Sequence, residues 1–406
     1  MNIQKIRADF PILKERINGH QLIYFDNAAT TQKPQQVLDS LMNFYTKQNA
    51  SIHRSIHTLG EQATVLYEQA RERVAQFINA QDASEIVFTR GATHSINAVA
   101  HSFVLPYLSA GDELVITELE HHSNLLVWQW VCKQTGATLK YIPVNEEGEV
   151  QYDMLDSIIT ARTKFVAICH ESNAIGTLVD ISRIVQAARA VGAKILVDAA
   201  QSAPHQKLDV QAIDCDFLVF SGHKMLAPTG IGVLYVQKNL HDALVPFEFG
   251  GGMLYSAQYD SAQYAKMPQL LEAGSPAVAQ AVALHAAIDY LEPFLINNQL
   301  RTHESQLCAQ LIDGLQTIQG LRIIGPVSQI KGFGHLVSFT IDDMHPHDIA
   351  AYLDTFAVCV RAGHLCAQPL AHKLGVDSLV RASFYIYNTE QEVHRMVDVL
   401  TKMRLP

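Results

Sequence analysis

The sequence lacks the features that would direct it to nucleic acid or to a membrane. Its 406 residues include 30 lysines and arginines against 40 aspartates and glutamates, giving a net charge of −10. Nucleic acid and anionic membrane surfaces are therefore not expected partners. No apolar run reaches the roughly 18–20 residues that a membrane-spanning helix needs. Residues 1–14 carry charged side chains instead of an apolar signal core, so we expect a cytoplasmic protein.

Cysteine is scarce, with six residues and no Cys-x-x-Cys pair or Cys/His spacing typical of a metal site. This argues against a disulfide framework, and no metal site is predicted. Five cysteines lie in apolar or helical contexts and are expected to be small buried side chains. These are Cys132, Cys169, Cys215, Cys308 and Cys359. The sixth, Cys366, differs because it lies in a polar segment.

Short apolar runs typical of strands alternate with helical patterns through most of the chain. They occupy residues 86–88, 114–116, 165–168, 195–197, 217–220 and 233–236. Near-continuous apolar strands separated by helices predict an α/β fold with a mostly parallel central sheet between helices.

After about Gly274 the pattern changes to two long helices and a smaller α+β region. We expect a large domain over residues 21–289. A small C-terminal α+β domain would combine residues 1–20 with 290–406.

Polar segments follow several of these strands, where ligands bind in parallel sheets. Lys224 ends Ser221-Gly222-His223-Lys224, and Asp198 ends another apolar run. A lysine with a lowered pKa readily forms a Schiff base, and a carboxylate can hold a pyridinium nitrogen. The alternatives are a surface lysine and a helix-capping aspartate. Together the two residues indicate a site for pyridoxal 5′-phosphate (PLP).

Other residues on this edge suit a phosphorylated aromatic cofactor. Thr93 follows Gly91 at the start of a helix, whose N–H groups favour a phosphate. His121 can stack on a flat ring and move protons, and metal binding is disfavoured because adjacent histidines do not share a face. Three further residues can reach the polar edge of the ring or simply be satisfied by the fold: Asn173, Gln201 and His223.

The segment 361–369 predicts an accessible thiol. Gly363 and a nearby proline favour a loop over a strand. Cys366 lies beside His364 and near Arg361, a setting that favours a reactive thiolate. The alternative is a loop cysteine without a role.

Arg381 interrupts the apolar pattern of residues 380–384. Its planar guanidinium can hold a substrate carboxylate through two hydrogen bonds. The alternative is an ion pair between domains.

In order and over essentially the whole chain, these segments resemble fold-type I PLP enzymes, and more narrowly group II cysteine desulfurases of the SufS/CsdA type. The matching segments are Ser221-Gly222-His223-Lys224, Asp198-x-x-Gln201, Glu120-His121-His122 and Arg361-x-Gly363-His364-x-Cys366-Ala367. The last segment is the specific one, since aminotransferases share only the PLP residues. The resemblance implies conversion of L-cysteine to L-alanine, with a persulfide on Cys366 and a SufE-, SufU- or CsdE-like acceptor protein for iron–sulfur cluster assembly.

The resemblance also implies roles for single residues. Lys224 would form the Schiff base and remove the α-proton, Asp198 would pair with the pyridinium nitrogen, and His121 would stack on the ring. Gln201 and Asn173 would approach the ring hydroxyl. The residues implied at the phosphate are Thr93, Ser221 and His223.

On the substrate side, the resemblance implies that Arg381 binds the carboxylate and that His364 supports Cys366. The substrate entrance would be lined by Ala28, Ala29, His53 and Arg54. Ser275 would reach the phosphate bound by the other subunit, so a homodimer is implied.

The sequence departs from the family pattern at a few positions. Leu365 stands where a second histidine is frequent, and Ala92 and Ser275 stand where threonines are frequent. Leu270-Leu271 precede Glu272, where an aromatic residue is frequent. The alternatives left open are a selenocysteine lyase at the same site, another PLP reaction such as transamination, and an inactive partner-binding protein.

Overall fold

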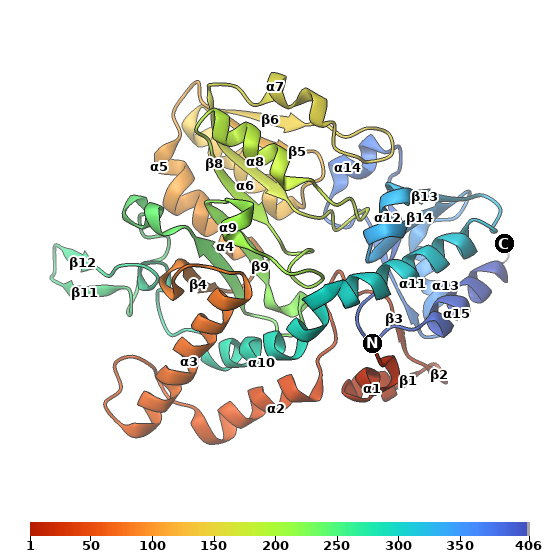
Figure 1. The fold of residues 1–406 in the computed structure, drawn as a ribbon, viewed down its shortest axis with the longest axis horizontal. Coiled ribbons are helices and arrows are strands. Elements are labelled where there is room, and N and C mark those ends of the chain that lie inside the picture. The colour runs from red at the N-terminus through yellow and green to blue at the C-terminus, as the bar shows by residue number, and fades with distance from the viewer. Residues whose placement is uncertain (404–406) are drawn as a thin grey trace.

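The computed structural model describes residues 1–403, and its larger part is built on a seven-stranded sheet (Figure 1). The spatial order is β4-β10-β9-β8-β7-β5-β6. The strands are β4 (Ile86–Thr89), β5 (Glu113–Thr117), β6 (Thr138–Ile142), β7 (Thr163–Cys169), β8 (Lys194–Asp198), β9 (Phe217–Ser221) and β10 (Gly232–Val236). β5 to β9 pair in parallel, whereas β10 is antiparallel to β9 and β4. The predicted α/β fold with a mostly parallel sheet is confirmed.

Helices cover both faces of this sheet, and the burial of β7 shows why its sequence is apolar throughout. Val166 and Ile168 pack on the side of α3 (Thr58–Phe77), α8 (Ile181–Ala190) and α10 (Val278–Leu295). Phe165 and Ala167 pack on the side of α4 (Ala92–Val99) and α6 (Leu126–Thr135). Alternate side chains point to opposite faces, so a strand buried on both faces has no polar position.

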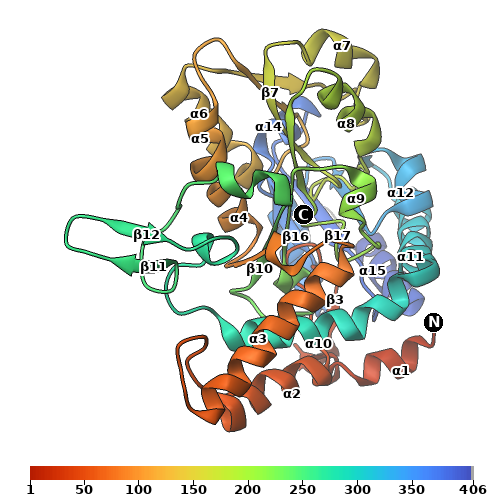
Figure 2. The same ribbon diagram turned by 60° about the vertical axis from the view of Figure 1, so that its left-hand side comes forward.

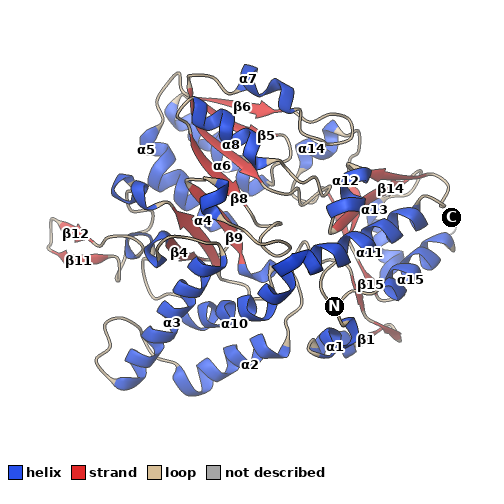
Figure 3. Cartoon of the chain, in the orientation of Figure 1, coloured by secondary structure: helices blue, strands red, loops and turns tan. Residues whose placement is uncertain are grey.

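A smaller antiparallel sheet lies beside the first, in the order β13-β14-β17-β16 (Figure 3). Its strands are β13 (Leu321–Ile324), β14 (Leu336–Ile341), β16 (Arg361–Gly363) and β17 (Leu379–Ser383). It shares a core with α11 (Gln299–Leu315), α13 (Pro346–Asp354) and α15 (Glu390–Thr401). β3 (Ile23–Tyr24) pairs in parallel with β15 (Val358–Cys359). The domain limits 21–289 and 290–406 stay a prediction.

The expectation of a loop from residue 361 onward was wrong for its first three residues. Arg361–Gly363 form β16, which pairs with β17 so that Arg361 lies opposite Arg381. Gly363 has a φ of +124°, so it ends the strand in a conformation that glycine adopts freely. The turn that carries Cys366 begins only at His364.

A hairpin of β11 (Leu254–Ala257) and β12 (Ala262–Tyr264) extends from the body of the molecule (Figure 2). Within residues 1–403, no helix is long and apolar enough to cross a membrane. The remaining elements are α1 (Ile3–Ala8), α2 (Gln35–Asn43), α5 (Leu105–Tyr107), α7 (Leu155–Ile158), α9 (Val210–Ile213), α12 (Val327–Phe333), α14 (Gln368–Lys373), β1 (Arg16–Ile17) and β2 (His20–Gln21).

Candidate active site

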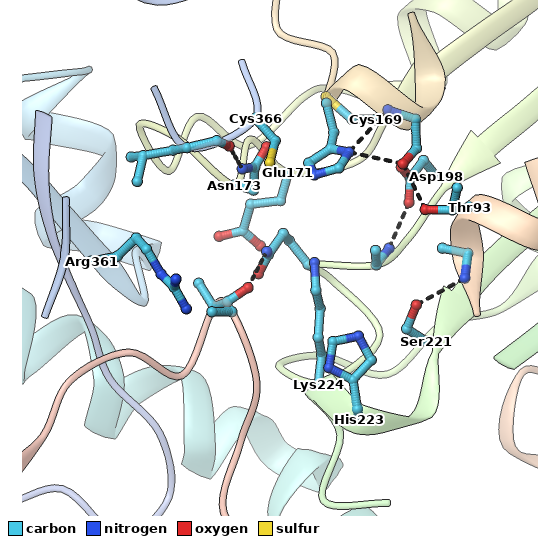
Figure 4. A pocket seen from close by; sticks show the side chains of 18 of the residues that line it. Thr93, Cys169, Glu171, Asn173, Asp198, Ser221, His223, Lys224, Arg361 and Cys366 are labelled. Carbon is cyan, nitrogen blue, oxygen red and sulfur yellow. Dashed lines mark hydrogen bonds between the residues drawn. The ribbon is translucent and has the colours of Figure 1, made fainter. Parts of the chain in front are cut away.

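A cavity of about 350 Å³ lies at the carboxyl ends of β7, β8 and β9, where the small sheet meets the large one (Figure 4). Most of the predicted site residues line it, although they come from distant parts of the sequence. They are Ala28, Ala29, Thr93, His121, Asn173, Asp198, Gln201, Ser221, His223, Lys224, Cys366 and Arg381. The parallel strand direction explains this convergence, because each strand delivers its following residues to the same edge.

Lys224 reaches into the cavity from the turn that follows β9 (Figure 4). Burial lowers the pKa of its amine to about 8, and Asp198 offsets part of that effect. Burial also raises the pKa of Asp198, which ends β8 and accepts a hydrogen bond from the Ala200 N–H at 2.9 Å. An amine with this pKa is partly unprotonated near neutral pH, as a Schiff-base nucleophile requires.

His121 is neutral and has a defined tautomer. Burial and the nearby Lys224 lower its pKa to about 4. Its Nδ1 accepts the Ser123 N–H at 3.1 Å, so the ring proton lies on Nε2. The Ser123 hydroxyl lies 2.6 Å from that of Thr93, which links the histidine to the start of α4. Sequence reasoning missed this link, since Ser123 carries no signal of its own.

The side of the cavity at α4 suits an anion. Gly91 precedes α4, and the Ala92 N–H donates to the Ser221 hydroxyl at 2.8 Å. Nδ1 of His223 is buried, and nothing in residues 1–403 pairs with it. Burial, together with Lys224 and Lys33, lowers the pKa of His223 to about 4. The helix start and an unused imidazole nitrogen therefore offer polar groups to a ligand.

Arg381 has an unused donor in the same region. Its Nη1 donates to the Asn173 carbonyl at 2.6 Å, and its Nη2 lies 3.4 Å from Oδ1 of Asp26. Its Nε is buried and has no partner in the described residues. Asp26 also binds Arg361 at 2.6 Å, and Arg361 lines the cavity. From the sequence, Arg361 was considered only as a neighbour of Cys366, because the pairing of β16 with β17 was not predicted.

Cys366 is exposed and lies beside Asn173 at the cavity (Figure 4). The chain passes through two successive left-handed residues there, Leu365 at φ +54° and Cys366 at φ +56°. The Asn173 side chain donates to the Leu365 carbonyl at 2.6 Å, and the His122 N–H donates to the Cys366 carbonyl at 2.8 Å. The structure thus holds the thiol at the cavity by contacts to the backbone around it.

Four predicted residues do not line this cavity. His364 is exposed and packs edge-on against His372. Ser275 lines a separate hollow of about 670 Å³, together with His53 and Arg54. Conversely, Cys169 and Glu171 line the main cavity without having been proposed for it. Burial raises the pKa of the Cys169 thiol well above its usual value, so Cys169 is not a thiolate.

These groups fit a carbonyl-bearing, phosphorylated pyridine such as PLP. The amine of Lys224 and the carboxylate of Asp198 share the cavity with a helix start and with the unpaired Nδ1 of His223. No group of three or more His, Cys, Asp or Glu residues within residues 1–403 is arranged to hold a metal ion.

Comparison with known proteins agrees with this architecture. Residues 23–396 match the family described as aminotransferase class-V. A probable cysteine desulfurase of Halalkalibacterium halodurans is 45% identical over 100% of this chain and 98% of its own length. A probable cysteine desulfurase of Staphylococcus epidermidis is 48% identical over 99% of this chain and 97% of its own length.

Solved structures agree as well. The S-sulfonic acid form of the cysteine desulfurase CsdA from Escherichia coli superposes with a TM-score of 0.91 at 38% identity, covering 98% of each chain. The apo cysteine desulfurase of Thermococcus onnurineus gives a TM-score of 0.93 at 37% identity, covering 98% of this chain and 97% of that one.

Fold, cavity and family match together define an enzyme of the class-V aminotransferase type. The full-length similarity to named desulfurases narrows this further: the chain belongs to the cysteine desulfurases of that family.

Proposed function

We propose that this enzyme removes sulfur from L-cysteine with bound PLP, releasing L-alanine and leaving a persulfide on Cys366. The observation that carries the proposal is that Lys224, Arg381 and Cys366 border one cavity of about 350 Å³. This combination provides an amine for the cofactor, a cation for the substrate carboxylate and a thiol for the substrate sulfur.

Lys224 would hold the cofactor, Asp198 its ring nitrogen, and Ser221, Thr93 and His223 its phosphate. His121 would stack on the ring, and Gln201 and Asn173 would lie near its hydroxyl. When bound, PLP stabilises the negative charge that forms at the substrate α-carbon. Gln201 is oriented for this position by the hydrogen bond from its Nε2 to the Ala28 carbonyl at 2.9 Å.

The chain's own groups supply the remaining chemistry. The unused Nε–H of Arg381 would bind the substrate carboxylate, next to Ala28 and Ala29. Lys224, with a pKa near 8, would take the α-proton after it is displaced from the cofactor.

The Cys366 thiolate would then attack the substrate sulfur. The carbon–sulfur bond breaks, its electron pair stays with the carbon fragment, and that fragment is protonated and leaves as alanine. His364, which begins the turn that carries Cys366, would support the thiolate from the solvent side.

We propose further that the persulfide passes to a SufE-, SufU- or CsdE-like acceptor protein for iron–sulfur cluster assembly. The exposure of Cys366 supports this, since a second protein can reach it. We also propose a cytoplasmic homodimer in which Ser275 of one subunit contacts the phosphate bound by the other. The position of Ser275 in a hollow apart from the main cavity is consistent with such a shared site.

The test compares the purified wild type with Cys366→Ala, using Cys359→Ala as a matched control. We expect a yellow protein in each case, and L-cysteine should yield alanine and sulfide with the wild type and the control only. Full alanine production by Cys366→Ala would refute the role of Cys366. L-selenocysteine is assayed in parallel; a selenocysteine lyase is the less favoured alternative, because the relatives are named for cysteine.

A further inference from the structure

The backbone around Cys366 adopts a conformation that it would not hold unaided. Leu365 and Cys366 both have positive φ values, +54° and +56°. Side chains with a Cβ disfavour this region, and two such residues in succession are unusual. Contacts from the surrounding structure must therefore hold the turn.

His122 makes two of these contacts, both to the backbone on the C-terminal side of the Cys366 side chain. Its backbone N–H donates to the Cys366 carbonyl at 2.8 Å. Its ring Nε2 accepts the Gln368 N–H at 3.1 Å. Gln368 is the first residue of α14, and the preceding Ala367 has no polar side chain to cap that helix. The His122 ring thus supplies the missing cap.

We propose that His122 is a positioning residue that holds the Cys366 turn when its ring is neutral and releases it when the ring is protonated. The reason is the direction of the hydrogen bond. Nε2 must present a lone pair to the Gln368 N–H, and a protonated imidazole has no lone pair left. Protonation would instead set two N–H groups against each other. In the desulfurase proposed above, on which this role rests, the neutral ring keeps the thiol facing the cavity.

The surroundings of His122 keep its ring neutral at ordinary pH. Burial is the larger cause that lowers the pKa of His122, and the nearby His364 lowers it further. The neutral His121 ring lies 6.3 Å away, and His372 of α14 packs against His364. On the same helix, Lys373 pairs with Glu118, so that cation is compensated. The turn should therefore be held near neutral pH and released only as the pH falls below the ordinary range of histidine.

Amide hydrogen exchange of residues 365–373 in the holoenzyme tests this directly, with rates corrected for the intrinsic effect of pH. In the wild type, exchange of this segment should rise about fivefold between pH 8 and pH 4.5, as expected for the loss of one hydrogen bond. His122→Ala should exchange about fivefold faster at both pH values. His122→Gln keeps an acceptor that does not titrate, so it should stay protected at both. His285→Gln, at a partly exposed position of α10, should behave as the wild type.

A wild type without the pH step, or a His122→Gln variant that keeps it, would overturn the proposal. The measurement needs no turnover, so it stands apart from the test of Cys366 as nucleophile. Kinetics add a second readout: His122→Ala should lower kcat with little change in KM for cysteine, and His122→Gln should restore most of it. An equal loss in both variants would also overturn the proposal.

Discussion

Replacement of Glu171 by glutamine should weaken the fold markedly, because this carboxylate is the centre of a buried charged cluster. Its two oxygens accept from Arg301 at 2.7 and 3.1 Å, and Oε1 also lies 2.7 Å from Nδ1 of His335. All three side chains are buried. On its other side, His335 lies 3.3 Å from the Gln201 side chain at the cavity.

The lowered pKa of Glu171 and the cost of breaking a buried ion pair lead to the same loss of stability. Burial raises the pKa of Glu171, but Arg301 and His335 outweigh it and hold the pKa at about 2. The difference between this pKa and the ordinary carboxyl pKa corresponds to about 3 kcal/mol in the free energy of unfolding. Removal of one partner of a buried ion pair typically costs about 3–5 kcal/mol. For 406 residues the unfolding entropy is about 0.85 kcal/mol per kelvin, so Tm should fall by about 4–6 °C.

Thermal unfolding of the wild type and Glu171→Gln at pH 7 measures this difference. Asp313→Asn is the control, because it breaks an exposed pair with Lys331 and should change Tm by about 1 °C or less. The folded pKa is depressed, so the stabilisation is fully present above about pH 4.5 and is lost as the pH falls towards 2. The difference in Tm between the wild type and Glu171→Gln should therefore become smaller at acidic pH. A gap below about 1 °C at pH 7, or one independent of pH, would refute the reasoning.

Two further substitutions test groups around the cavity. Arg381→Lys keeps a positive charge but loses the planar guanidinium, so KM for L-cysteine should rise about tenfold or more in steady-state assays; an unchanged KM would argue against a carboxylate contact. Lys33→Met removes an ammonium that donates to the His223 carbonyl at 3.1 Å and whose pKa burial lowers to about 8. In the unfolded chain the lysine titrates near 10.5, so between pH 8 and 10.5 the unfolded state binds more protons than the folded state. Over this interval the free energy of unfolding of the wild type should therefore rise by about 3 kcal/mol relative to the variant, or about 4 °C in Tm. A constant difference across that interval would contradict the lowered pKa.

The large sheet and the convergence of its polar strand ends were predictable from the sequence. Short apolar runs such as 165–168, separated by helical patterns, are typical of strands buried on both faces, and parallel strands bring the residues that follow them to one edge. Asp198 and Lys224 were predictable for the same reason, since each follows such a run.

The buried charges were not predictable in this way. Arg301 and Glu304 lie three residues apart on α11, a spacing that usually marks a solvent-facing side of a helix. In the structure this side faces the loops that follow β7 and β8, where Arg301 binds Glu171 and Glu304 lies 2.8 Å from Nδ1 of His205. Only the placement of the two sheets reveals that these charges meet partners from distant segments. β16 was missed because its strand pairing depends on Leu379–Arg381 and not on its own sequence.

Asn173 connects the two sides of the proposed reaction. Its carbonyl accepts from Nη1 of Arg381, and its side chain donates to the Leu365 carbonyl in the turn beside Cys366. Both distances are 2.6 Å, and both contacts are buried. Because one residue touches both the arginine and the turn, Asn173 fixes the positions of Arg381 and of the thiol turn relative to each other. Together with His122, this arrangement makes the position of the thiol depend on the cavity on one side and on α14 on the other.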